Sequence, residues 1–119
     1  MSVVLVTGAG SGFGKITAVE FARKGDTVYA GDFEAQCMRT FRNLTRLLAA
    51  EKASWHDVVR TSCYLRDIER DYDSFNRVRT MFMNGIGLDP LPASTGIQAR
   101  ICRSDLLVEI EAIAIIPPE

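Results

Sequence analysis

A glycine-rich turn near the start of the chain is the first feature that could bind a ligand. The apolar run Val3–Val6 leads directly into Gly8, Gly12 and Gly14, which open a helical stretch. Glycines let the backbone approach a pyrophosphate, and the free N–H groups at the start of the helix attract its charge. Asp32 lies 24 residues after Gly8, near the distance at which an acidic residue binds a ribose hydroxyl. The spacing predicts either a dinucleotide site at these four residues or a βαβ unit that is only structural.

A carboxylate near the C-terminus is the second candidate for chemistry. In the predicted strand Leu106–Ile116, alternation places Glu109 on one face with Leu107 and Ile113. Such neighbours would desolvate the carboxylate and raise its pKa toward neutrality, which suits acid/base work. Glu109 is therefore either catalytic or a buried, hydrogen-bonded structural residue. Because its face mixes carboxylates with large aliphatics, we expect a second copy of the chain to cover it, the alternative being an exposed face.

Composition limits the remaining possibilities. A chain of 119 residues with a formal net charge of -1 fits one domain (1–119), and it carries no basic patch for nucleic acid or an anionic membrane. Three separated cysteines, Cys37, Cys63 and Cys102, and a lone histidine, His56, form neither a disulfide framework nor a metal-ligand pattern. With no signal peptide or membrane span in the sequence, we expect a cytoplasmic protein that acts on small molecules.

The periodicity predicts an α/β, more narrowly α+β two-layer, domain of order β-α-β-α-β-α-β-β, with a mixed sheet and helices mainly on one face. Ser54 and Asp57 have the spacing of a capped turn. Tyr72 is expected to face inward from its helix, and Val59 is expected to lie on the same strand face as Cys63. The last two strands are expected to pair as a hairpin. The predicted elements are strand Val3–Val6, a first helix, strand Thr27–Ala30, helix Glu34–Lys52, strand Val58–Leu65, helix Arg70–Asn84, and strands Ser94–Arg103 and Leu106–Ile116.

Residues 1–32 resemble the opening of a short-chain dehydrogenase/reductase. Thr7, Gly8, Gly12 and Gly14 match the glycine fingerprint of that family, and Asp32 matches its acidic residue. The catalytic Tyr-x-x-x-Lys of the family does not occur in the chain, and the second half of its sheet is missing. The resemblance therefore implies no dehydrogenase; we expect no cofactor, with NAD(P) as the alternative.

From about Gly31 onward (33–119) the chain resembles the Rid/YjgF family, whose members are trimers of a chorismate-mutase-like fold with ligand sites at subunit interfaces. The segments that carry the resemblance are Gly31–Gln36, Ala53–Val59, Tyr64–Ile68, Phe75–Val78, Leu91–Thr95 and Leu107–Ala114. The resemblance implies a cytoplasmic homo-oligomer, a trimer, whose partner is a small-molecule carboxylate rather than nucleic acid or membrane.

The resemblance also implies candidate site residues. Glu109 matches a carboxylate that orients water, Asn76 matches a residue that borders the cleft, and Ser94 with Thr95 would contact the ligand. The arginine that binds the substrate carboxylate in imine-deaminating members is absent because Ser94 follows Pro92-Ala93 directly, and Arg100 would supply positive charge unless it is simply solvated.

The leading hypothesis for function is a Rid-like protein that binds or hydrolyses a small carboxylated metabolite; as an enzyme it would be a hydrolase or deaminase. The alternatives are a non-catalytic module that binds a nucleotide phosphate at Gly8 to Gly14, and a gene-fusion or designed chimera without activity.

Overall fold

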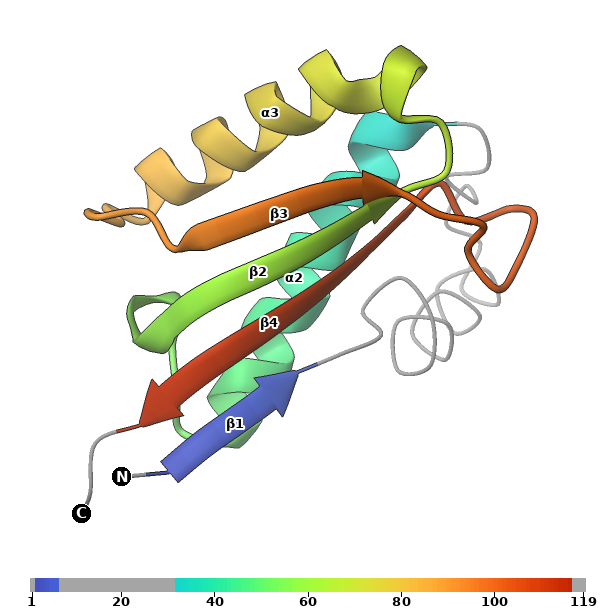
Figure 1. Cartoon of the computed structure of the whole chain (residues 1–119). Coiled ribbons are helices and arrows are strands. Elements are labelled where there is room, and N and C mark those ends of the chain that lie inside the picture. The colour runs from blue at the N-terminus through green and yellow to red at the C-terminus, as the bar shows by residue number, and fades with distance from the viewer. Residues whose placement is uncertain (1, 7–31, 117–119) are drawn as a thin grey trace, which may run out of the picture.

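The structure, a computed structural model, describes residues 2–6 and 32–116. Its four strands form one mixed sheet in the order β1-β4-β2-β3 (Figure 1). Strand β4 runs antiparallel to both of its neighbours, whereas β2 and β3 are parallel. The strands are β1 (Ser2–Val6), β2 (Val58–Leu65), β3 (Ala93–Gln98) and β4 (Val108–Ile116).

Two long helices, α2 (Phe33–Ala50) and α3 (Ile68–Gly85), cover one face of this sheet (Figure 1). Each begins at an aspartate whose carboxylate accepts a backbone N–H of the first turn: Asp32 caps α2 and Asp67 caps α3. The short helix η1 (Trp55–Asp57) has a complete capping box, which confirms the predicted cap by Ser54 and Asp57. The prediction of an α+β fold with helices on one face is confirmed.

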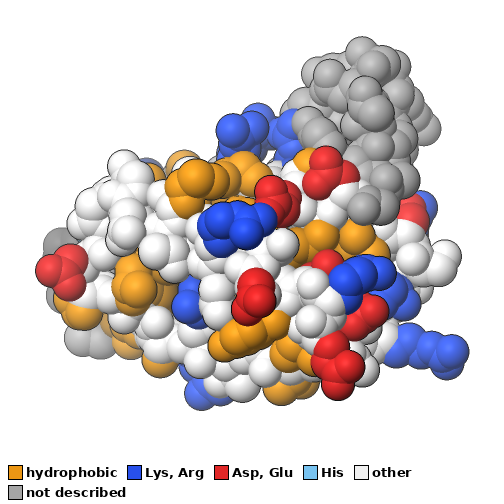
Figure 2. Space-filling model, turned by 90° about the horizontal axis from the view of Figure 1, so that it is seen from above, with side chains coloured by type: hydrophobic (Ala, Val, Ile, Leu, Met, Phe, Trp, Pro, Cys, Tyr) orange, Lys and Arg blue, Asp and Glu red, His pale blue; other side chains and the backbone are white. Residues whose placement is uncertain are grey.

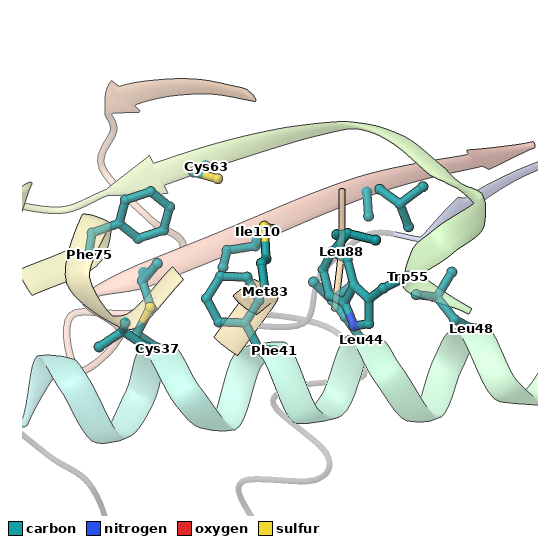
Figure 3. Packing of buried hydrophobic residues seen from close by; sticks show 14 of the residues in the cluster. Cys37, Phe41, Leu44, Leu48, Trp55, Cys63, Phe75, Met83, Leu88 and Ile110 are labelled. Atoms are coloured by element: carbon teal, nitrogen blue, oxygen red, sulfur yellow. The ribbon is translucent and has the colours of Figure 1, made fainter. Parts of the chain in front are cut away.

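The core lies between the helices and the sheet (Figure 3). Phe41 of α2 stacks on Phe82 of α3 with ring centroids 4.9 Å apart, and Trp55 packs against both rings. The Trp55 indole N–H donates to Thr45 Oγ1 at 2.8 Å, so burial of the ring leaves no donor unpaired. On the sheet side, β4 buries every second residue, namely Val108, Ile110, Ala112 and Ala114, as its alternation predicts.

The predicted hairpin between the last two strands is wrong. Strand β3 pairs in parallel with β2 after the crossover through α3, and β4 then inserts between β2 and β1. The residue composition of the two strands explains why β4 and not β3 lies in the middle of the sheet. All six residues of β3 are exposed and mostly small or polar, which suits an edge strand, whereas the aliphatic side of β4 needs the covered centre of the sheet.

Two predictions of side-chain direction are also wrong. A β-bulge between Val58 and Arg60 reverses the alternation, so that Val58 is buried and Val59 is exposed. Tyr72 of α3 is exposed, and Asp71, whose carboxylate pairs with Arg70, is buried in the same turn instead.

The predicted first helix and the strand Thr27–Ala30 lie outside the described residues. Neither α2 nor α3 is apolar enough along its length to cross a bilayer.

Candidate functional site

Strand β3 presents Ser94 and Thr95 to opposite faces of the sheet. In the parallel register, Ser94 lies beside Thr61 on the face that packs against the helices, and its Oγ is 3.9 Å from Cys63 Sγ. Thr95 lies beside Ser62 on the other face, where its hydroxyl accepts from Arg60 Nη2 at 3.3 Å. One ligand in a single copy of the chain therefore contacts one of these hydroxyls, not both.

Glu109 lies on the helix-free face of the sheet. This face, which we define by register, is formed by Arg60, Ser62, Tyr64, Thr95, Ile97, Glu109, Glu111 and Ile113. Glu109 is opposite Tyr64 and Glu111 is opposite Ser62, and both carboxylates are half-buried. The predicted mixture of carboxylates and aliphatics on one face of β4 is thus present, and it extends across β2 to Ile97 of β3.

Helix α3 carries the predicted Asn76 and a second polar residue that the sequence reasoning missed. Asn76 is half-buried, and Arg79 lies one turn later on the same side of the helix. The Arg79 guanidinium carbon lies 5.6 Å from the Phe75 ring centroid, and its Nε is buried without a hydrogen-bond partner among the described residues. The signal in the sequence was an arginine four residues after a buried phenylalanine.

Arg100 does not lie on a strand. Strand β3 ends at Gln98, and Arg100 is exposed in the segment 99–107 that follows. Two side chains fix this segment by its backbone: Arg66 donates to the carbonyls of Ile101, Arg103 and Leu106, and Gln36 of α2 bonds the segment near its end. The sequence reasoning did not anticipate either role.

The predicted dinucleotide residues are only in part within the described residues. Gly8, Gly12 and Gly14 lie outside them. Asp32 is described, and its carboxylate accepts the Ala35 N–H at 3.1 Å as the N-cap of α2. Its observed role is therefore the structural one.

The cysteines and the histidine form no metal site. Among residues 2–6 and 32–116 no group of three metal-ligating side chains occurs, and the three cysteines are free thiols. Burial raises the pKa of Cys37 to about 12, with a further contribution from the nearby Cys63. Burial also raises the pKa of Cys63, opposed by hydrogen bonds to Thr61 and Ser94 and by the positive charge of Arg79. Both buried thiols are therefore poor nucleophiles at neutral pH.

The arrangement provides two groups of polar side chains, one on each face of the sheet. Ser94 and Cys63 lie together on the helix side near the β3 edge, and the positive charge of Arg79 on α3 lowers the pKa of the Cys63 thiol. A hydroxyl and a guanidinium are therefore available on this side to bind an anion. Glu109 lies on the opposite face, where a carboxylate can accept a proton or orient water. Seen from above Figure 1, the surface mixes apolar, basic and acidic side chains without a region of one charge (Figure 2).

Comparisons with known proteins agree with this fold. Residues 9–116 match the family model described as Endoribonuclease L-PSP. A RutC family protein of Pyrococcus abyssi is 30% identical over 87 residues, which cover 73% of this chain and 65% of that protein. The match therefore spans less than two thirds of this curated relative.

Solved structures show the same likeness. A member of the YjgF/YER057c/UK114 family from Mycobacterium tuberculosis aligns with a TM-score of 0.67 and 27% identity over 96% of this chain and 79% of its own. TdcF of E. coli, crystallised with bound serine, aligns with a TM-score of 0.67 and 23% identity over 73% of this chain and 67% of its own, which shows a shared fold.

The family match begins within the segment predicted to resemble a short-chain dehydrogenase, and the comparisons give that resemblance no support. The predicted resemblance to the other family is confirmed: the chain belongs to the Rid/YjgF family, whose family model is described as Endoribonuclease L-PSP.

Proposed function

We propose that this protein binds or hydrolyses a small carboxylated metabolite, an imine, enamine or related compound, at an interface between two copies of the chain. The observation that carries the proposal is the placement of Ser94 and Glu109 on opposite faces of one sheet. The sheet separates the two side chains within a copy. A ligand at the β3 edge can contact both only if a second copy brings its own Glu109 there.

The helix-free face supports such an interface. Glu109 and Glu111 are half-buried among aliphatic side chains, and Ile97 of the same face is 46% exposed. The described helices lie on the other side of the sheet (Figure 1). A surface that combines exposed aliphatics with polar groups suits association of like copies, and proteins of this family are typically homo-oligomers. We propose a trimer.

Hydrolysis of an imine requires only groups that these residues supply. Water adds to the imine carbon as Glu109 accepts its proton, the proton passes to the nitrogen, and loss of ammonia leaves the 2-oxo acid. Ser94, with Asn76 of α3, would orient the substrate by hydrogen bonds. That TdcF, a protein of this fold, holds serine supports a site for a small amino-acid-like ligand.

The alternative functions have less support. A phosphate cradle would use Gly8, Gly12 and Gly14 with Asp32, yet the Asp32 carboxylate caps α2. An NAD(P) site there remains the weaker proposal, and we propose that the protein works without a cofactor.

Ligand binding and catalysis can be tested together. Thermal shifts are measured with 2-oxo acids, chorismate, NAD(H) and NADP(H), while ammonia release is followed from an imine that an amino-acid oxidase generates in place. We expect stabilisation by oxo acids, and Glu109→Gln should lose the acceleration of ammonia release above the spontaneous hydrolysis of the imine while retaining binding. Glu69→Gln, an exposed change on α3, is the matched control.

Three results would contradict the proposal. Stabilisation by dinucleotides alone would favour the phosphate cradle, and a monomer by light scattering at assay concentration would remove the shared site. A wild-type protein that responds to none of the compounds would leave the inert chimera as the explanation.

A further inference from the structure

Arg79 is a partly buried arginine whose donors are not all used by the described residues. Its Nε is buried, and none of residues 2–6 and 32–116 accepts a hydrogen bond from it. A buried donor on a charged group is costly to leave unpaired, and such exceptions mark places where a ligand or partner completes the bonding.

Neighbouring arginines of α3 contrast with Arg79. Arg70 pairs with the buried Asp71, and Arg77 pairs with Glu34 of α2. No carboxylate of the described part of the chain forms an ion pair with Arg79. Its guanidinium carbon instead lies 5.6 Å from the Phe75 ring centroid, and this cation–π contact restricts the position of the side chain.

Arg79 lies near enough to Cys63 of β2 for its positive charge to lower the pKa of that thiol. Cys63 Sγ in turn lies 3.9 Å from Ser94 Oγ of β3. Phe75 projects from α3 into the layer between the helices and the sheet, as Cys63 does from β2 (Figure 3). A guanidinium from the helix and a hydroxyl from the edge strand therefore border the same end of this layer.

We infer that Arg79 is the anion-binding residue of this protein, and that its guanidinium binds the carboxylate of the ligand beside Ser94. The inference rests on the proposed function and names the residue that selects its substrate class. Because Nε is a buried donor without a partner among the described residues, we place the carboxylate on the side of the guanidinium, where Nε and one Nη form a bidentate pair with it.

Other arginines near the edge strand are less suited to this role. Arg60 donates to Thr95 on the opposite face of the sheet. Arg66 uses its guanidinium on three carbonyls of the segment 99–107. Arg100, which we expected to supply the charge, is exposed beyond the end of β3.

The test compares a carboxylate with its neutral analogue. Isothermal titration calorimetry measures Kd for 2-oxobutanoate and for 2-oxobutanamide with wild type, Arg79→Gln and Arg79→Lys. Arg77→Gln removes the same charge from an exposed position of the same helix and serves as the control. We expect Arg79→Gln to weaken the acid about 10- to 100-fold, with the amide unchanged within twofold, and Arg79→Lys to restore part of the loss.

Each other outcome overturns a stated claim. Acid affinity that stays within twofold in Arg79→Gln, or an equal loss for acid and amide, overturns the role of Arg79 alone. Dissociation of the oligomer in Arg79→Gln with unchanged acid affinity per folded copy shows that a second copy binds Arg79, which also overturns it. If wild type binds neither compound, the proposed function is refuted, and the inference about Arg79 is refuted with it. If Arg79→Gln does not fold, the decision rests on Arg79→Lys, in which the Kd for the acid is compared with the Kd for the amide. If this ratio equals that of wild type, the bidentate contact through Nε and one Nη is refuted.

Discussion

Replacement of Arg66 by methionine should release the segment 99–107 from the body of the protein. The Arg66 guanidinium donates to Leu106 O at 2.6 Å, to Ile101 O at 3.0 Å and to Arg103 O. Methionine keeps an apolar stem of similar reach and removes all three donors. The segment joins β3 to β4, so its release should also loosen the strand that carries Ser94.

The magnitude follows from the number and exposure of these bonds. A hydrogen bond from a charged donor contributes about 1.5 to 3 kcal/mol when buried, so three would contribute about 4.5 kcal/mol or more. Arg66 is only half-buried, and water can replace part of the bonding in the variant. We therefore expect Arg66→Met to lower the free energy of unfolding by about 2 to 3 kcal/mol, which lowers Tm by roughly 6 to 15 °C for a chain of this size.

Urea unfolding followed by Trp55 fluorescence, at one protein concentration, measures this loss. Arg66→Lys should recover little, because one ammonium cannot reach three carbonyls in different directions. Arg42→Met, an exposed change on α2, is the control and should stay within 0.5 kcal/mol, the usual range for a surface substitution.

A second variant tests whether the segment behaves as one unit. The Gln36 amide donates to Asp105 O and accepts from Leu107 N, both at 2.9 Å. If loss of either side chain is enough to detach the segment, the second substitution adds little to the first. The double variant Arg66→Met with Gln36→Ala should then lose less unfolding free energy than the two single losses added together, by about 1 kcal/mol or more. Strict additivity, or a loss below 0.5 kcal/mol for Arg66→Met alone, would refute the reasoning.

Four further outcomes follow from the core, the caps and the thiols. Leu44→Ala, at a fully buried position of α2, should cost about 2 to 5 kcal/mol in urea unfolding, and Ser54→Ala should cost about 1 kcal/mol through loss of the η1 capping box. Thiol labelling at pH 8 should modify Cys102 at once but Cys37 and Cys63 only after unfolding. Because burial raises the pKa of Cys37 from 9.0 to about 12, its effect on stability is constant below pH 9 and becomes unfavourable as the unfolded chain ionises above it. Between pH 9 and pH 10 wild type should lose about 1 kcal/mol more than Cys37→Ala, and equal losses would contradict the assigned burial.

Periodicity predicted the elements that have one strongly apolar side. Strand β4 alternates without interruption, and its buried residues are the predicted ones. Helix α2 was predicted to within two residues at its C-terminal end, because the side chains around Phe41 and Leu44 recur at helical spacing and Asp32 supplies a cap.

Pairing between strands could not be obtained in the same way. Proximity in sequence favoured a hairpin of the last two strands, whereas the structure places β4 beside β2 and leaves β3 at the edge. The deciding factor was how much apolar surface each strand must bury, which is a comparison between strands rather than a local pattern. The bulge at Val59 is likewise set by the register with β4 and has no marker such as glycine.

The candidate site shows why residue lists from a sequence need a fold. Ser94, Thr95 and Glu109 were named as one site, yet the alternation of β3 sends the two hydroxyls to opposite faces, and Glu109 shares a face with Thr95 only. A single ligand that contacts Ser94 and Glu109 therefore requires two copies of the chain. No signal in the sequence is strong enough to single out Arg79, because an arginine in an amphipathic helix is usually solvated. What distinguishes it is that its neighbours on α3 pair with carboxylates while it lies against Phe75 with a donor to spare. If the acid and its amide bind Arg79→Gln as they bind wild type, the charge of the site must come from the second copy, and the interface rather than the helix would select the substrate.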